Sequence, residues 1–133
     1  MIVLDEQLSG YEVGPAIAQW YRGRVANITE IRPRSHILDE AVPELLRRVS
    51  QPLFVTINVD DFWRRVAPHD DFGIACFELA NSQAREVSPW LRKLLGLSLF
   101  KTRRQRMGKI IKVTPTQILH YSKDSWAIER LGW

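Results

Sequence analysis

This sequence contains very little cysteine: Cys76 is the only one among 133 residues, so no disulfide can form within the chain. That usage is typical of proteins from a reducing cytosol. Cys76 stands in the apolar run Gly-Ile-Ala-Cys-Phe, which predicts a buried small side chain and argues against a catalytic thiol. The three histidines, His36, His69 and His120, are scattered without a ligand spacing and are predicted to bind no metal.

Long hydrophobic runs are missing as well. No stretch reaches the roughly 18 consecutive apolar residues that a membrane-spanning helix needs. The opening Met-Ile-Val-Leu run is followed at once by Asp5 and Glu6, so it is too short and too acidic for a signal peptide. We therefore expect a soluble, cytoplasmic protein that makes no contact with a membrane.

The overall composition is that of one globular domain, with 45% apolar and 26% charged residues. The charge, however, is unevenly distributed along the chain. Residues 1–100 hold 11 Lys and Arg against 13 Asp and Glu, whereas residues 101–133 hold 8 against 2. An acidic body with a basic end suits a protein that holds a metal in one place and a polyanion in another. A basic end that only improves solubility is the alternative.

Strand and helix patterns alternate through residue 96, which predicts a mostly parallel sheet with helices on both faces. Strands are expected at 2–4, 25–28, 53–57 and 72–77, where apolar residues form short runs. Helices are expected at 15–21, at 38–49 and from 89 to 95, the last with Ser88 as its N-terminal cap. The final third differs, because 109–113 and 117–121 flank a Thr-Pro-Thr turn and predict a hairpin, with one more strand between 126 and 133.

Three acidic pairs stand at positions where chemistry is plausible. Asp5-Glu6 and Asp60-Asp61 each follow a predicted buried strand, and Asp39-Glu40 begins a predicted helix. Sites in open parallel sheets form beyond the carboxyl ends of the strands. Carboxylates gathered there stay ionised together only if a cation compensates them, and oxygen-only ligands suit Mg²⁺ or Mn²⁺. Alternatively, each pair is a local cap or turn, roles for which Asp is common. The fourth pair, Asp70-Asp71, precedes a strand and is predicted to lie in a loop at the opposite edge of the sheet.

These segments together resemble the short PIN-like proteins, whose first strand ends in Asp-Glu-Asn-Leu-Ser. The opening Met-Ile-Val-Leu-Asp-Glu-Gln-Leu-Ser matches that motif, and Leu38-Asp39-Glu40 is similar to the second motif, an Asp at an acidic helix start. The third motif, a strand reading Val-Thr followed by Asp-x-Asp-Phe, is similar to residues 54–62. The resemblance covers roughly residues 1–79 and depends on the combination of motifs.

The resemblance implies a PIN-like three-layer sandwich over residues 1–100, with residues 101–133 as a basic β-hairpin extension packed on the same domain. It also implies a metal-dependent endoribonuclease, often the toxin of a toxin–antitoxin pair, with Asp5 and Asp39 as the first two metal ligands. The third motif departs from the pattern, since Asn58 replaces the usual Asp and one extra residue precedes Asp61. Either Asp60 or Asp61 then serves as the third acidic ligand, with Asn58 able to add a carbonyl oxygen, and Glu6 and Glu40 are adjacent candidates.

The basic segment 101–112 lies outside the resemblance and contains no acidic residue. Its cations supply sequence-independent contacts to phosphates, so we predict RNA binding by Lys101, Arg103, Arg104 and Arg106. Pairing with a small antitoxin protein or forming a homodimer edge are alternative uses, because an exposed hairpin can accept an added strand. Trp126 and Trp133 are expected to pack at an edge, with base stacking as the alternative.

Two functions therefore stand after the sequence alone. The first is a Mg²⁺- or Mn²⁺-dependent endoribonuclease that uses Asp5, Asp39 and Asp60 or Asp61. The second is a catalytically weakened PIN-like module that binds RNA or a partner protein, which the Asn58 departure motivates. A purely structural oligomer subunit is a third alternative.

Overall fold

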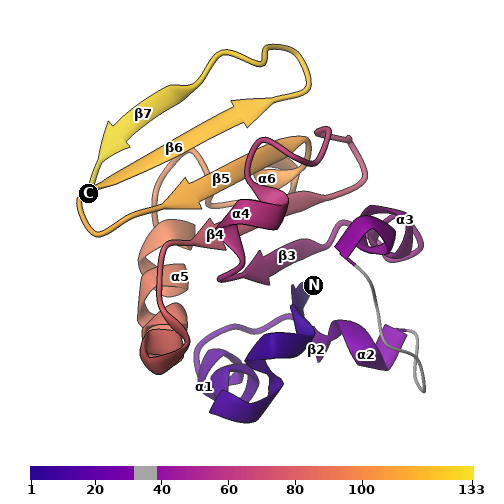
Figure 1. Cartoon of the computed structure of the whole chain (residues 1–133), viewed down its shortest axis with the longest axis vertical. Helices are drawn as coiled ribbons and strands as arrows, with labels where there is room; N and C mark the ends of the chain where they lie inside the picture. Colours follow the sequence, from indigo (N-terminus) through magenta and orange to yellow (C-terminus); the bar gives the residue numbers. More distant parts are fainter. Residues whose placement is uncertain (32–38) are drawn as a thin grey trace.

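A computed structural model describes residues 1–31 and 39–133 of the chain. The described residues form a seven-stranded sheet in the order β2-β1-β3-β4-β5-β6-β7 (Figure 1). The first five strands in this order run parallel, and β6 and β7 run antiparallel to their neighbours. The strands are β1 (Ile2–Leu4), β2 (Val25–Asn27), β3 (Leu53–Thr56), β4 (Gly73–Phe77), β5 (Lys109–Val113), β6 (Gln117–Ser122) and β7 (Glu129–Gly132).

The helices are short, and the longest of those described, α5, has nine residues. Helices of this length depend on tertiary packing, because isolated ones are marginal in water. The α-helices are α1 (Val13–Ala18), α2 (Ile28–Ile31), α3 (Val42–Leu46), α4 (Val59–Phe62), α5 (Val87–Leu95) and α6 (Arg103–Arg106). The 3₁₀ turns are η1 (Glu6–Tyr11), η2 (Asp39–Ala41) and η3 (Asn81–Glu86).

The helices cover both faces of the sheet, as the alternating sequence pattern predicted (Figure 1). Residues of β1 alternate between the faces: Ile2 and Leu4 pack with α1 and α5, whereas Val3 packs with α2, α3 and α4. The central strands β1, β3 and β4 are buried along their whole length. Burial on both faces explains why these strands are continuous apolar runs in the sequence. The fold is therefore an α/β architecture around a mostly parallel sheet.

The C-terminal hairpin continues the same sheet. Strands β5 and β6 pair antiparallel, from Lys109 opposite Ser122 to Val113 opposite Ile118. Strand β5 also pairs in parallel with β4, so the predicted hairpin and the predicted last strand are both confirmed. None of the helices in the described residues is long and apolar enough to cross a membrane.

The structure corrects the predicted helix boundaries. The helix expected at 38–49 is a 3₁₀ turn at 39–41 followed by α3, which ends at Leu46. Ser88 is not the cap of α5, which begins one residue earlier at Val87. Instead, Ser88 is buried and its Oγ accepts a hydrogen bond of 2.9 Å from the indole N–H of Trp20. A half-buried indole N–H needs a hydrogen-bond acceptor. The sequence did not indicate Ser88 as this acceptor, because it lies 68 residues from Trp20.

Parallel pairing creates two chemically different edges. The carboxyl edge is where β1, β3, β4 and β5 end, so that Asp5, Ile57, Glu78 and Thr114 follow at the same side. The amino edge is where these strands begin, next to Met1, Pro52, Phe72 and Gly108. Backbone hydrogen bonds of 2.9–3.0 Å from Leu53 to Met1, from Gly73 to Pro52 and from Gly108 to Phe72 fix the alignment of the amino edge.

Candidate functional site

Asp5 is the most firmly positioned acidic residue at the carboxyl edge. Its backbone N–H donates to the Val55 carbonyl at 3.0 Å, which continues the pairing of β1 with β3. Its side chain is buried, with 5% of the residue exposed, and its Oδ2 accepts a 2.7 Å hydrogen bond from the Thr56 hydroxyl. The first of the predicted carboxylates is thus held between two central strands.

Burial raises the pKa of the Asp5 carboxyl group above its usual value, because desolvation disfavours the anion. The Thr56 hydroxyl and the backbone N–H groups of Glu6 and Gln7 oppose this shift, whereas the charge of Glu6 adds to it. Among the described residues, no cation forms an ion pair with Asp5. A buried carboxylate without a cationic partner is a group that a bound cation would stabilise.

Thr56 connects Asp5 to the third motif. The Thr56 Oγ1 accepts a hydrogen bond of 2.9 Å from the backbone N–H of Asn58 while it donates to Asp5. The Asn58 side-chain amide in turn donates to Asp61 Oδ2 at 2.7 Å. Asp5, Asn58 and Asp61 therefore belong to one polar chain that crosses the ends of β1 and β3. Sequence reasoning gave Thr56 no role, although a threonine directly before Ile-Asn at a strand end was a visible signal.

A second residue that the sequence analysis missed is Asn27, the last residue of β2. Its Nδ2 donates to the Asp5 carbonyl at 3.4 Å, and its Oδ1 accepts from the backbone and hydroxyl of Thr29 at 3.1 and 2.9 Å. Asn27 therefore stabilises the backbone of Asp5, whereas Thr56 binds the carboxylate of Asp5. The signal in the sequence was an asparagine at the end of one predicted strand, next to another predicted strand that ends in an acidic residue.

Asp60 and Asp61 face different surroundings, although they are adjacent in α4. Asp61 lines an open depression of about 1070 Å³ that Glu40 and Arg47 also line. Asp60 lines a separate depression of about 370 Å³ together with Glu78 and Lys112. Asn58 lines the depression of Asp60 and donates its side-chain hydrogen bond to Asp61, so this bond links Asp61 to the Asp5 chain.

Asp39 is the first residue of the turn η2, and the resemblance likewise placed it at the start of a helical segment. Its side chain lies outside the part that the structure describes. The next residue, Glu40, shares a depression with Asp61, so η2 approaches α4. Within the described residues, no three His, Cys, Asp or Glu side chains lie close enough together to hold a metal ion. The donors Asp5, Asn58 and Asp61 match Mg²⁺ or Mn²⁺ in type, and a complete set requires a further carboxylate.

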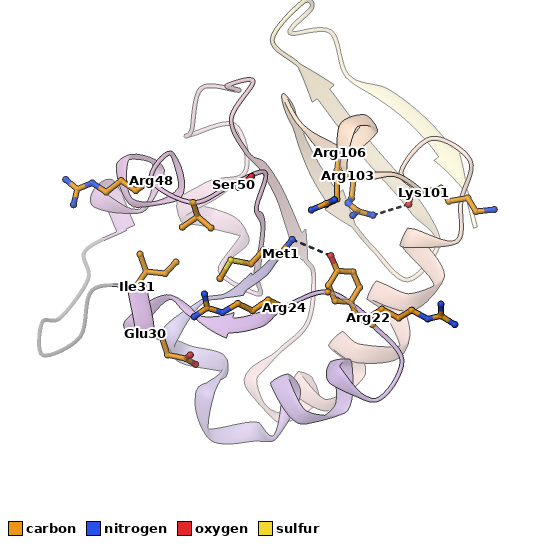
Figure 2. A pocket seen from close by; sticks show the side chains of 13 residues that line it. Met1, Arg22, Arg24, Glu30, Ile31, Arg48, Ser50, Lys101, Arg103 and Arg106 are labelled. Atoms are coloured by element: carbon orange, nitrogen blue, oxygen red, sulfur yellow. Dashed lines mark hydrogen bonds between the residues drawn. The ribbon is translucent and has the colours of Figure 1, made fainter.

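The predicted RNA-binding residues lie away from Asp5. Lys101, Arg103 and Arg106 line a depression at the amino edge, which is the edge of the sheet opposite the carboxyl edge (Figure 2). Arg104 is exposed on the same short helix but does not line that depression. The structure therefore separates the basic segment from the acidic strand ends, because 101–108 leads into the start of β5 and not into its end.

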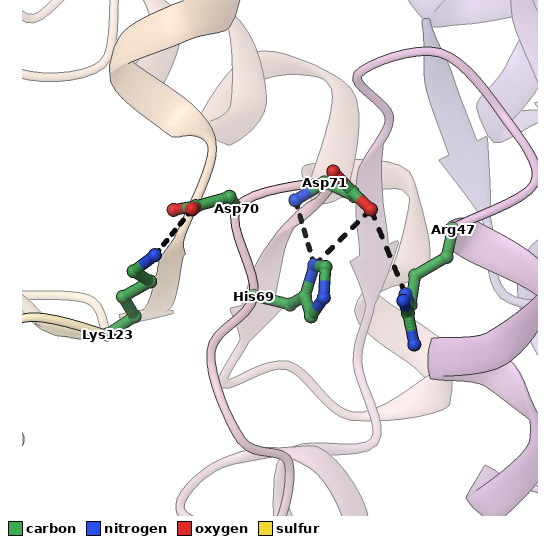
Figure 3. Close-up of polar contacts among 5 residues, drawn as sticks. All are labelled: Arg47, His69, Asp70, Asp71 and Lys123. Atoms are coloured by element: carbon green, nitrogen blue, oxygen red, sulfur yellow. Dashed lines mark hydrogen bonds and ion pairs between the residues drawn. The ribbon is translucent and has the colours of Figure 1, made fainter.

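Asp70 and Asp71 lie in the loop before β4 at the amino edge, which confirms their predicted position (Figure 3). Asp70 forms an ion pair with Lys123, and Asp71 lies 3.8 Å from Arg47 and 3.6 Å from His69. All these side chains are substantially exposed, so the pairs contribute little stability.

Comparisons with protein-family models, with curated proteins and with solved structures find no match to this chain. The PIN-like resemblance accordingly rests on the three sequence motifs. What the fold adds is the placement of two of those motifs, around Asp5 and around Asn58 and Asp61, in one hydrogen-bonded chain.

Proposed function

We propose that this protein is a PIN-like, metal-dependent endoribonuclease whose chemistry takes place at the carboxyl edge of the sheet. The observation that supports this most strongly is the buried carboxylate of Asp5, which has no cationic partner among the described residues and is linked through Thr56 to Asn58 and Asp61. The carboxyl edge of a parallel sheet is also where α/β proteins place their sites.

A bound Mg²⁺ or Mn²⁺ would supply Lewis-acid chemistry on a phosphodiester. Asp5 and Asp61 would hold it, with Asn58 as a neutral oxygen donor and Asp39 as the further carboxylate that the resemblance implies. Thr56 would fix the rotamer of Asp5 through its 2.7 Å hydrogen bond, so that the second carboxylate oxygen is presented in a constant direction. In this proposal the protein acts in the cytoplasm as the toxin-like member of a pair with a small antitoxin.

A second candidate is a PIN-like binding module that has lost efficient catalysis. The hydrogen bond between Asn58 and Asp61 favours it, because the amide occupies one oxygen of a carboxylate that a metal would need. Asn58 also contributes no negative charge where the family pattern has Asp. Under this candidate, RNA or a partner protein binds and no phosphodiester bond is cleaved.

Calorimetric Mn²⁺ binding and cleavage of a single-stranded RNA, measured in one buffer, test the proposal. We expect the wild type to bind Mn²⁺ and cleave, and Asp5→Asn to lose both. Asp124→Asn is the matched control, since Asp124 is exposed beyond the end of β6 at the amino edge. Asp61→Asn changes an exposed residue and gives a second reading if Asp5→Asn fails to fold.

The outcomes separate the two candidates. RNA binding by a folded wild type that neither binds Mn²⁺ nor cleaves would support the binding module and exclude the nuclease. Cleavage that persists at full rate in both Asp5→Asn and Asp61→Asn would exclude the carboxyl edge as the site of the chemistry.

A further inference from the structure

Cationic side chains gather around a depression at the amino edge. This depression has a volume of about 980 Å³, and its lining includes one carboxylate, Glu30, and six cationic side chains (Figure 2). The cations are Arg22, Arg24, Arg48, Lys101, Arg103 and Arg106. We call this depression the basic pocket.

The fold assembles the basic pocket from three separate stretches of chain. Arg22 and Arg24 directly precede β2, Arg48 follows α3 before β3, and residues 101–106 precede β5. All three stretches lead into strands that run in the same direction, so their ends meet at one edge. The pocket is therefore a product of the parallel topology and not of a single basic run.

Most of these charges lack a counter-ion. Within residues 1–31 and 39–133, Arg48 is the one pocket cation that forms an ion pair, with Glu44 at 3.3 Å. Glu30, the one carboxylate in the lining, accepts a hydrogen bond of 3.0 Å from the backbone N–H of Asn27. Cations held together without counter-charges repel one another, and a bound anion relieves that repulsion.

Arg106 is the residue that distinguishes this pocket from an ordinary basic surface. It is 5% exposed, and its Nη1 donates to the carbonyls of Phe100 and Lys101 at 3.1 and 3.3 Å. Its Nε is buried and has no hydrogen-bond partner among the described residues. Desolvation lowers the pKa of this guanidinium, and the neighbouring charge of Arg103 lowers it further. A guanidinium that is desolvated and only partly hydrogen-bonded gains from a nearby anion.

Backbone contacts fix the position of α6, which carries Arg106. A Cβ atom on Gly73 would lie 2.4 Å from the Arg106 carbonyl oxygen, so the glycine permits α6 to sit directly against the start of β4. The backbone N–H of Gly108 then donates to Phe72 at 2.9 Å and anchors the entry to β5. Together with the two hydrogen bonds of Nη1, these contacts hold the guanidinium at the pocket instead of free on the surface.

We propose that the basic pocket binds the clustered phosphate groups of a ligand. Five of its six cations are arginines, whose planar guanidinium groups bind phosphate in a bidentate manner. Its volume is at the upper end of the ligand-pocket range of about 300–1,000 Å³. A nucleoside polyphosphate and a nucleic-acid strand both present this chemistry. The proposal is independent of the carboxyl edge and holds whether or not that edge cleaves RNA.

Binding of pyrophosphate and ATP by calorimetry, and of a labelled single-stranded RNA by fluorescence anisotropy, tests the proposal with the full chain in EDTA. We expect Arg24→Gln combined with Arg103→Gln to weaken binding by about tenfold or more, as loss of two charge-assisted phosphate contacts implies. The matched control combines Arg85→Gln with Arg92→Gln, which removes the same charge from exposed positions outside the pocket. We expect the control to change binding by less than about twofold at physiological salt, where distant charges are screened.

Comparing the three probes identifies the kind of ligand that supplies the phosphates. Binding of ATP and pyrophosphate points to a nucleotide, whereas binding of RNA alone points to a nucleic-acid strand. Equal loss in the pocket variant and the control variant would overturn the proposal, as would no binding of any probe by the wild type. A poly-glutamate peptide that binds as tightly as the phosphate probes would also overturn it. Asp5→Asn is expected to leave all three probes bound, which keeps this test separate from that of the nuclease.

Discussion

At the scale of single residues, several ionisable side chains of the described residues are buried, and three of them lead to predictions. Asp5, Cys76 and His120 are all buried, and burial shifts the pKa of each toward the neutral form. For Asp5 this creates a conflict between stability and the proposed function, because a metal ligand has to be ionised. Each shift leads to a measurable consequence.

Asp5 predicts an unusual pH dependence. Its pKa is raised on folding, so the native state binds this proton more tightly than the unfolded state. The stabilisation is therefore fully present below the unfolded value near 3.8 and is lost as the pH rises through the folded value. We expect the melting temperature of the wild type, relative to Asp5→Asn, to increase as the pH falls from 7 to about 4 in metal-free buffer. A constant or decreasing difference in thermal unfolding would contradict the prediction.

His120 predicts the opposite trend. Its Nε2 is buried and has no hydrogen-bond partner in the described part of the chain. It lies 3.6 Å from the exposed carboxylate of Glu129, and desolvation lowers the pKa of His120 despite that charge. The unfolded histidine protonates near pH 6.5 and the folded one at lower pH, so stability falls as the pH drops below 6.5. His120→Gln is expected to remove this loss. Melting temperatures of both proteins between pH 7.5 and about 5 check it, and parallel curves would refute it.

Cys76 is predicted to be chemically inert in the folded protein. It lies in β4 with none of its surface exposed, and burial raises the pKa of its thiol. The thiolate is the reactive form, so an aromatic disulfide reagent should label the native chain hardly at all and the urea-unfolded chain fully. Rapid labelling without denaturant would show that β4 is less protected than the packing indicates.

At the scale of elements, the contact between α6 and the start of β4 sets the geometry of the amino edge. Gly73→Ala would place a methyl group 2.4 Å from the Arg106 carbonyl, which is backbone and cannot move aside alone. We expect this change to lower the free energy of unfolding by about 1–3 kcal/mol, as overpacking does. Gly10→Ala is the control, because a Cβ atom there meets nothing within 4 Å. Urea unfolding of both variants distinguishes a specific contact from a general effect of alanine.

At the scale of the whole molecule, the sheet separates an acidic edge from a basic one. Strand β4 has five residues, so the two edges lie roughly 13 Å apart at about 3.3 Å per residue. Sites at that separation without shared partners usually contribute independently. We therefore expect the Arg24 and Arg103 substitutions to leave Mn²⁺ affinity unchanged. They should also weaken binding of the phosphate probes by the same factor whether or not Asp5→Asn is present. A calorimetric departure from additivity would indicate that one ligand contacts both edges.

The sequence by itself determined the parallel α/β fold and the placement of Asp5. Strands such as Ile2–Leu4 and Leu53–Thr56 are buried on both faces of the sheet, and for that reason they are continuous apolar runs in the sequence. An acid that directly follows such a run must lie at the carboxyl edge. The C-terminal hairpin was predictable for a similar reason, since its turn and its two apolar strands are local features.

Only the tertiary structure decided the contacts that join distant parts of the chain. The Ser88 hydroxyl meets Trp20 across 68 residues, and the Thr56 hydroxyl meets Asp5 across 51 residues. The basic pocket likewise combines Arg24 with Arg103, which no sequence spacing connects. Side-chain direction and the meeting of strand starts are consequences of packing, so local sequence patterns could not contain them.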